Sequence, residues 1–128
     1  MRTLLVADDN RLSRELVRDL FESAHCRVVE AANGQEVLEC LEAASPDLVL
    51  LDLEMPVKDG FAALVEIRKN PRFSGMPVMA LTAKAMQLDR DRILTAGFDA
   101  CVTKPVDVAK LRKRVYELLR SSRKGESP

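Results

Sequence analysis

The chain has 128 residues with 20 basic and 20 acidic side chains, so its formal net charge is zero. A chain of this length suits one domain with its own hydrophobic core, and the apolar fraction of 47% excludes wholesale disorder. The neutral net charge argues against binding to DNA, RNA or anionic membranes through bulk electrostatics.

Short apolar runs predict five β-strands. They cover Thr3–Ala7, Arg27–Ala31, Leu48–Leu51, Val78–Thr82 and Ala100–Thr103. The first, third and fourth runs do not alternate with polar residues, which is typical of parallel strands covered on both faces. The fifth run is less apolar, which fits a strand at the edge of the sheet.

The segments between these runs predict helices. Asn10 can cap a first helix, in which Leu12, Leu16 and Leu20 recur every four residues with Val17 and Phe21 beside them. Asn33 can cap a second helix, with a glutamate three residues later in a capping-box-like arrangement. A third helix is expected after Gly60, ending at Asn70–Pro71, a fourth over about Met86–Ala96, and a fifth from near Asp107 onward. This alternation predicts a three-layer α/β/α sandwich around a five-stranded parallel sheet.

Side chains that can bind a metal ion or a phosphoryl group lie at the ends of four of the predicted strands. These are Asp8 and Asp9, Asp52, Thr82 and Lys104. Because ligands of parallel α/β sheets bind beyond the carboxyl ends of the strands, we expect these side chains to converge. Three close carboxylates repel one another unless a cation joins them, and oxygen ligands of this kind suit Mg²⁺. We therefore predict a magnesium site at which one carboxylate accepts a phosphoryl group.

Each of these features also has a simpler explanation when it stands alone. Asp8 and Asp9 could favour the N-terminus of a helix through the helix dipole. Asp52 could be a turn residue, and Lys104 with Pro105 could form an ordinary loop. Their occurrence at four strand ends of one sheet favours the functional interpretation.

Four segments together resemble the receiver domain of two-component response regulators, the CheY-like family. They are LLVADDN (4–10), LVLLDLEMPVKDG (48–60), ALTA (80–83) and GFDACVTKP (97–105). The resemblance covers about Arg2–Leu119 and implies the strand order 2-1-3-4-5. We accordingly expect a receiver domain over residues 1–121 and a polar, disordered tail over residues 122–128.

The resemblance implies a phosphoryl acceptor and its metal ligands. Asp52 would accept the phosphoryl group, Asp9 would bind Mg²⁺ directly, and Asp8 would bind it through water. The backbone carbonyl of Glu54 would complete the protein ligands. The donor would be a phosphohistidine on a sensor histidine kinase or a histidine phosphotransfer protein, and acetyl phosphate could also serve.

The resemblance also implies residues that respond to the phosphoryl group. Thr82, followed by Ala83, would bind a phosphoryl oxygen and shift toward it. Lys104 would pair with the phosphoryl group, and Pro105 would set the loop that carries this lysine, through a cis bond in many members.

Three positions modify this expectation. Many members have Tyr or Phe where this chain has Cys101, so coupling through a swinging aromatic ring is in doubt, and we expect Cys101 to be a small strand residue rather than a redox switch. Glu54 and Lys84 would flank the mouth of the site. They could pair and impede an attacking water, or simply be solvated. We expect them to tune the lifetime of the phosphate.

Other functions fit less well. A flavodoxin-like site for FMN needs a phosphate-binding loop after the first strand, where Asp8 and Asp9 would repel the ligand. A haloacid-dehalogenase-type phosphatase needs an aspartate where this chain has Glu54, and no GxxxxGK[ST] motif of a P-loop occurs. We predict a stand-alone signalling switch with an unknown protein target, not an enzyme. The alternatives are a receiver fragment of a hybrid histidine kinase and a pseudo-receiver that acts only as an interaction module.

Cysteine content suggests the cellular compartment of the protein, and the charge pattern suggests which surfaces could bind a partner. The three cysteines form no CxxC pair and there is one histidine, which argues against a zinc site and favours reduced thiols. Without a signal peptide or a membrane-spanning run, a cytoplasmic bacterial protein is expected. Residues 1–64 have a net charge of −7 and residues 65–128 of +7. We interpret the basic last helix mainly as a solvated face, with an acidic partner as the lesser alternative.

Overall fold

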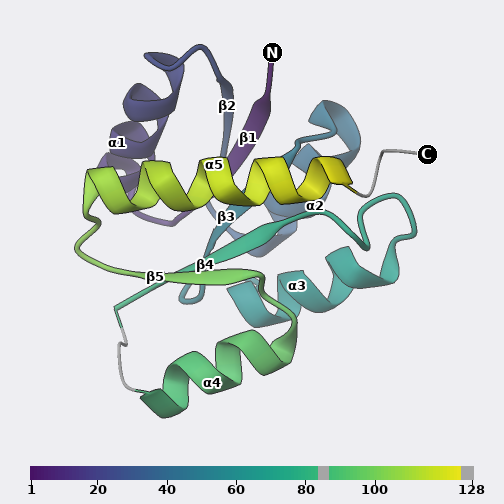
Figure 1. Cartoon of the computed structure of the whole chain (residues 1–128). Coiled ribbons are helices and arrows are strands. Elements are labelled where there is room, and N and C mark those ends of the chain that lie inside the picture. Colours follow the sequence, from purple (N-terminus) through teal and green to yellow (C-terminus); the bar gives the residue numbers. More distant parts are fainter. Residues whose placement is uncertain (84–86, 125–128) are drawn as a thin grey trace.

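The structure is a computed structural model that describes the backbone of residues 1–83 and 87–124 and the side chains of residues 1–83 and 89–120. Strands and helices alternate along the chain. The elements are β1 (Thr3–Ala7), α1 (Arg11–Glu22), β2 (Arg27–Ala31), α2 (Gly34–Ala44), β3 (Leu48–Asp52), α3 (Gly60–Lys69), β4 (Val78–Thr82), α4 (Gln87–Ala96), β5 (Ala100–Thr103) and α5 (Val108–Lys124). The strands form one parallel sheet in the order β2-β1-β3-β4-β5, so the predicted fold class and strand order are confirmed (Figure 1).

The sheet has helices on both faces, because its central strands are apolar on both sides. Every residue of β3 and β4 is buried. Along β1, Leu4 and Val6 belong to the core layer that contains residues of α1 and α5, whereas Leu5 and Ala7 belong to the layer that contains residues of α2, α3 and α4. The two core layers therefore follow from the period-two alternation of side chains along each strand. The edge position predicted for the fifth strand is also confirmed.

Side-chain caps fix where the helices begin. Asn10 accepts a hydrogen bond from the amide of Ser13 (3.1 Å), and Asn33 accepts one from the amide of Glu36 (2.9 Å). The Glu36 carboxylate accepts one in return from the amide of Ala32 (2.9 Å), next to the cap residue. These caps agree with the sequence prediction, and they place the loops that precede α1 and α2 at the carboxyl ends of β1 and β2.

The buried face of α1 differs from the leucine repeat seen in the sequence. Leu12 and Leu16 are 75% and 50% exposed, whereas Val17 and Phe21 are buried against the sheet. At 100° per residue, one helix face can hold Val17 and Phe21 while the leucines four residues apart lie beside it. The four-residue spacing was therefore a correct sign of a helix but did not mark its core face.

Gly60 begins α3 in direct contact with the end of β3. A Cβ at this position would lie 2.5 Å from the carbonyl oxygen of Asp52 and 2.9 Å from the Cα of Leu53. We expect Gly60→Ala to lower the free energy of unfolding by about 2 kcal/mol, because backbone atoms would have to move. At Gly75 a Cβ would meet nothing within 4 Å, so Gly75→Ala should be neutral or slightly stabilising. Urea unfolding of both variants measures the difference, and equal effects would contradict a close approach at Gly60.

The last helix, α5, lies with α1 on one face of the sheet, where its buried residues Leu111, Val115 and Leu119 join the core layer (Figure 1). Its backbone is helical to Lys124, and the division of the chain at residue 121 stays a prediction. No helix in the described part of the chain combines the length and the apolar character needed to cross a membrane.

Candidate functional site

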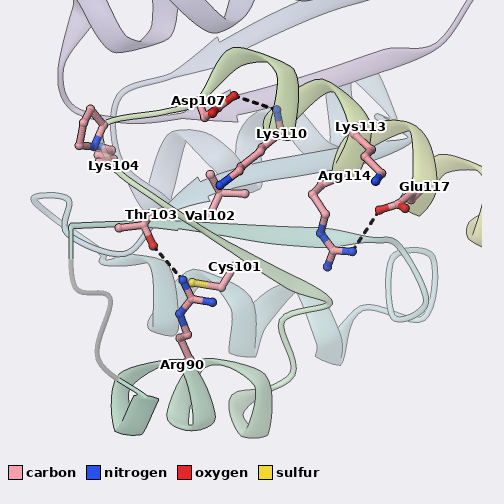
Figure 2. Close-up of a pocket in the computed structure, with 11 residues that line it drawn as sticks. Arg90, Cys101, Val102, Thr103, Lys104, Asp107, Lys110, Lys113, Arg114 and Glu117 are labelled. Atoms are coloured by element: carbon pink, nitrogen blue, oxygen red, sulfur yellow. Dashed lines mark hydrogen bonds and ion pairs between the residues drawn. The ribbon is translucent and has the colours of Figure 1, made fainter.

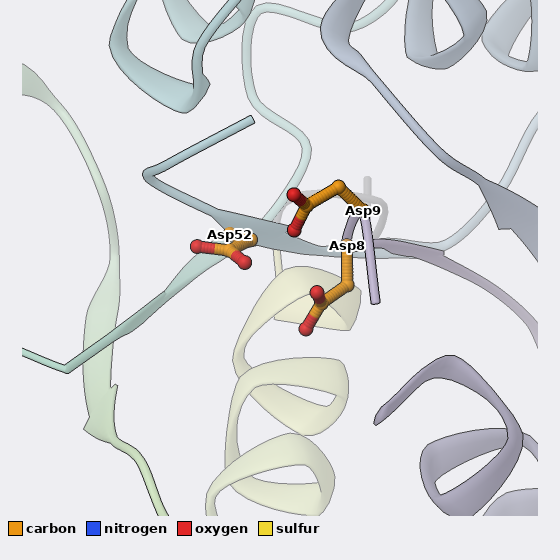
Figure 3. A group of neighbouring side chains, drawn as sticks. All are labelled: Asp8, Asp9 and Asp52. Carbon is orange, nitrogen blue, oxygen red and sulfur yellow. The ribbon is translucent and has the colours of Figure 1, made fainter. Parts of the chain in front are cut away.

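Three carboxylates meet at the carboxyl edge of the sheet (Figure 3). Asp8 and Asp9 follow β1, Asp52 ends β3, and these two strands are neighbours with Ala7 opposite Leu51. Each aspartate offers a ligand oxygen, and the three oxygens lie within 4.8 Å of one another. Asp8 and Asp52 are buried and Asp9 is exposed, so the cluster is open to solvent on one side.

The ammonium group of Lys104 lies between two of these carboxylates. Its Nζ is 2.8 Å from Oδ2 of Asp8 and 2.9 Å from Oδ2 of Asp52. Lys104 follows β5, and its amide donates a hydrogen bond to the carbonyl of Thr82 at the end of β4 (2.7 Å). The bond from Lys104 to Pro105 is cis. Three carboxylates and one ammonium leave a formal charge of −2, which a divalent cation would balance.

Backbone amides orient the two buried carboxylates. Oδ1 of Asp8 accepts a hydrogen bond from the amide of Asn10, and Oδ1 of Asp52 accepts one from the amide of Glu54, both at 2.9 Å. Each of these carboxylates therefore has one oxygen held by its own loop and the other held by Lys104. All the possible ligands in the cluster are oxygen atoms, the donor type that Mg²⁺ prefers.

Burial and charge shift the pKa values in the cluster. Burial raises the pKa of Asp52 above its ordinary value, although hydrogen bonds from Lys104 and from the Glu54 amide act in the opposite direction. Burial alone would lower the pKa of Lys104, but its hydrogen bonds to Asp8 and Asp52 outweigh this and raise the pKa. The lysine thus stays charged, while a single ammonium shared by two carboxylates does not fully offset the burial of Asp52.

This geometry agrees with the result of comparison with known proteins. The family model of the response regulator receiver domain matches residues 4–116. The chain belongs to this family. It is 30% identical over 118 residues to the polar-differentiation response regulator DivK of Brucella anthropi, covering 92% of this chain and 96% of DivK.

Solved structures of receiver domains are similar over nearly the whole chain. The chemotaxis protein CheY4 of Vibrio cholerae has a TM-score of 0.86 and 25% identity, covering 92% of this chain and 98% of CheY4. The receiver domain of the sensor histidine kinase PA1611 of Pseudomonas aeruginosa has a TM-score of 0.84 and 30% identity, covering 92% and 97% of the two chains. That structure has a magnesium ion coordinated in its active site cleft. Receiver domains are phosphorylation-dependent signalling switches, generally not classical enzymes, and bind Mg²⁺ at an acidic pocket.

Thr82, the residue expected to bind a phosphoryl oxygen, also lies near the acidic cluster. Thr82 ends β4 and is buried, and β4 is the strand next to β3, with Leu81 opposite Asp52. Thr82 and Glu54 line the same cavity of about 250 Å³ beside the carboxyl edge. Glu54 and Ala83 are exposed, and Lys84 lies outside the described residues. The structure thus brings Thr82 and Glu54 to one side of the acidic cluster.

Cys101 lies on β5, a strand at the edge of the sheet. Its side chain is half-buried, and burial raises the pKa of its thiol. A raised pKa keeps the thiol protonated and unreactive near neutral pH. Cys101 is thus a half-buried residue of a strand, and its lack of a redox role stays a prediction.

The sequence did not reveal that Arg14 supports the acidic site. Its Nη1 donates a hydrogen bond to the backbone carbonyl of Asp8 (2.8 Å), and its Nε pairs with Glu30 of β2 (3.0 Å). Arg18, one turn later on α1, also pairs with Glu30 (2.7 Å). The two arginines at i and i+4 were visible, but only the fold shows that β2 places a carboxylate against them.

Glu30 is expected to contribute stability that depends on pH. Burial alone would raise the pKa of Glu30, but hydrogen bonds from Arg18 and Arg14 outweigh it, so the pKa lies below its ordinary value. A carboxyl group whose pKa is lowered by folding stabilises the protein above its unfolded pKa, and this stability is lost as the pH falls through the folded pKa. Glu30→Gln should therefore lower the free energy of unfolding by about 1 kcal/mol at neutral pH, and the difference should shrink as the pH falls through the folded pKa of Glu30. A difference that does not change with pH in urea unfolding would contradict this assignment.

Proposed function

We propose that this receiver domain accepts a phosphoryl group from a phosphohistidine onto Asp52, in a reaction that requires Mg²⁺, and that this changes its protein-binding surface. The observation that carries the proposal is the position of Asp52. It is buried at the carboxyl edge of the sheet, 2.9 Å from the ammonium of Lys104 and grouped with the carboxylates of Asp8 and Asp9.

The residues present fit the metal that the family binds. Asp8, Asp9 and Asp52 would hold Mg²⁺, and the backbone carbonyl of Glu54 would be a further ligand. The exposure of Asp9 leaves one side of the cluster open to water, which Mg²⁺ retains among its ligands. When bound, Mg²⁺ would offset the charge of the carboxylates and of the phosphoryl oxygens.

The protein's own groups prepare Asp52 as the nucleophile. The amide of Glu54 and the ammonium of Lys104 each hold one of its oxygens, so the carboxylate is oriented before a donor arrives. A carboxylate oxygen forms the new bond to phosphorus, the phosphorus–nitrogen bond of the phosphohistidine breaks, and its electron pair stays on the imidazole. Lys104 then pairs with the phosphoryl oxygens, and the Thr82 hydroxyl donates a hydrogen bond to one of them.

The same two residues connect the site to the surface. Thr82 ends β4 and Lys104 directly follows β5, and the 2.7 Å hydrogen bond between their backbones links the loops after these two strands. A shift of Thr82 toward the phosphoryl group would therefore be transmitted to Lys104 and Pro105, and onward to α4 and α5. Phosphorylation would bias the equilibrium between two arrangements of this surface. Ala83 follows Thr82 and would move with it, whereas Cys101 on β5 offers no aromatic ring through which the shift could be coupled to the surface.

The proposed partners are a sensor histidine kinase or a histidine phosphotransfer protein as donor, and a downstream protein as target. We propose a cytoplasmic location for the protein. We expect it to make no direct contact with nucleic acid or membrane. A stand-alone response regulator is proposed first, supported by the similarity over 96% of DivK. A receiver of a hybrid histidine kinase is the second candidate, because the receiver of PA1611 is also similar. The mass of the protein in its native cells distinguishes the two.

Intact-mass spectrometry tests the proposed function. The protein is incubated with acetyl phosphate and Mg²⁺, and it should gain the mass of one phosphoryl group. A parallel sample with excess chelator should gain none. The absence of a mass increase with Mg²⁺ would overturn the proposal, as would an equal increase with and without the chelator.

Glu54 and Lys84 are proposed to lengthen the lifetime of the phosphate by impeding an attacking water. Glu54 lines the cavity that also contains Thr82, and its side chain is exposed at the mouth of the site. We expect Glu54→Ala and Lys84→Ala to speed dephosphorylation severalfold, measured as loss of the phosphoryl mass after removal of the donor. Glu39→Ala, at an exposed position of α2, should leave the rate unchanged. Unchanged rates in both site variants would exclude this role.

A further inference from the structure

A pocket of about 660 Å³ lies between α4, β5 and the first turns of α5 (Figure 2). Its floor is β5, with the half-buried side chains of Cys101 and Val102. Arg90 extends toward this strand from α4, while Lys110 and Arg114 extend toward it from α5 (Figure 2). The volume falls in the range of small-molecule sites in proteins, about 300–1,000 Å³.

The pocket is strongly basic in a chain whose formal net charge is zero. Its charged lining residues are Arg90, Lys104, Lys110, Lys113, Arg114, Asp107 and Glu117. Lys104 is already paired with the aspartates of the acidic cluster. Without it, four cations still face two carboxylates, so the pocket attracts anions.

Both carboxylates of the pocket are engaged within α5. Asp107 caps the helix by accepting a hydrogen bond from the amide of Lys110 (3.1 Å), and Glu117 pairs with Arg114 (3.1 Å). Among the described residues, the ammonium groups of Lys110 and Lys113 have no ion pair. The pocket thus contains side-chain cations without a counter-charge, and these favour a ligand with several negative charges.

We propose that this pocket binds a nucleoside polyphosphate. Guanidinium groups bind phosphate oxygens in a bidentate manner, and lysines add point charges, so Arg90, Lys110 and Lys113 can bind a chain of phosphates. Val102, whose half-buried side chain lies on the α5 side of β5, provides an apolar surface for a base. The pocket is open on one side, but its volume of about 660 Å³ is that of a small-molecule site, and binding of an acidic protein instead is an outcome that the test below detects. The proposal does not depend on phosphorylation of Asp52.

Titration of the full chain with ATP, in buffer free of divalent metal, tests this proposal. Saturable binding by calorimetry is expected, with amide NMR shifts concentrated in β5 and the first turns of α5. The double variant Arg90→Ala/Lys110→Ala removes cations from opposite sides of the pocket and should weaken binding by about tenfold or more. The double variant Arg112→Ala/Arg120→Ala removes the same charge from exposed positions of α5 outside the pocket lining and should bind as the wild type does.

Four results would overturn the proposal. The first is the absence of saturable binding at millimolar ATP, and the second is equal weakening in both double variants, which would indicate attraction by overall charge. Equally tight binding of inorganic tripolyphosphate would exclude a role for the nucleoside, and displacement of ATP by an oligoglutamate peptide that binds more tightly would assign the pocket to an acidic protein partner. All four replaced residues are exposed, and thermal unfolding confirms that the variants keep their fold.

Discussion

Asp52→Asn is expected to abolish phosphorylation by acetyl phosphate under conditions in which the wild-type protein is modified. The asparagine amide has the size of the carboxylate and can still accept the hydrogen bond from the Glu54 amide, but it is not a competent nucleophile toward phosphorus. The replacement also removes one of the three oxygens that would hold Mg²⁺. Intact-mass spectrometry should therefore show no phosphoryl adduct at any time point.

This variant should not fail because it unfolds. Burial raises the pKa of Asp52, and a carboxyl group with a raised folded pKa reduces stability as the pH rises above its unfolded pKa toward the folded one. Replacing it with a neutral amide removes this penalty at neutral pH. In metal-free buffer, Asp52→Asn should therefore be at least as stable as the wild type in urea unfolding.

A matched control separates the acceptor from a general effect of charge. Asp19→Asn makes the same chemical change at an exposed position of α1, and this variant should be phosphorylated as the wild type is. A phosphoryl adduct that persists in Asp52→Asn would assign the acceptor role to another residue, and peptide mapping would then locate it.

The sequence predicted the sheet and the carboxyl-edge cluster because both depend on local patterns. Apolar runs without alternation marked β3 and β4, and parallel strands joined by helices must end at the same edge of the sheet. The strand pattern alone was therefore enough to bring Asp8 and Asp52 together, although they lie 44 positions apart in the chain. The helix caps at Asn10 and Asn33 were predictable for the same reason, since a cap and its amide partner are three residues apart.

Features that depend on contacts between distant elements could not be predicted in this way. The leucines of α1 marked a helix, but which side faced the core depended on how α1 packs on the sheet. The support of the Asp8 carbonyl by Arg14 depends on the distance between α1 and β1, and the pocket above Cys101 depends on how α4 and α5 flank β5. Even the pairing of Lys104 with both Asp8 and Asp52 gives a geometry that strand ends alone do not specify.

Lys104→Met is expected to make the stability of the protein strongly dependent on Mg²⁺. Methionine has a similar length but no charge, so the buried carboxylates of Asp8 and Asp52 would lose the ammonium that lies 2.8 and 2.9 Å from them. Removing one partner of a buried ion pair costs about 3–5 kcal/mol. Because the Lys104 side chain is 27% exposed and water reaches the cluster, we expect a loss nearer ~2 kcal/mol in metal-free buffer.

Saturating Mg²⁺ should restore most of this lost stability. The variant cluster has three carboxylates and no internal cation, so it should bind Mg²⁺ about tenfold more tightly than the wild type, and binding to the folded state alone stabilises it. Lys113→Met removes the same charge from an exposed position of α5 and should change neither stability nor Mg²⁺ affinity. Urea unfolding with and without Mg²⁺ measures all three proteins. If Lys104→Met lost the same stability in both buffers, Lys104 would be a packing residue rather than the counter-charge of the acidic cluster, and its proposed pairing with the phosphoryl group would lose its electrostatic basis.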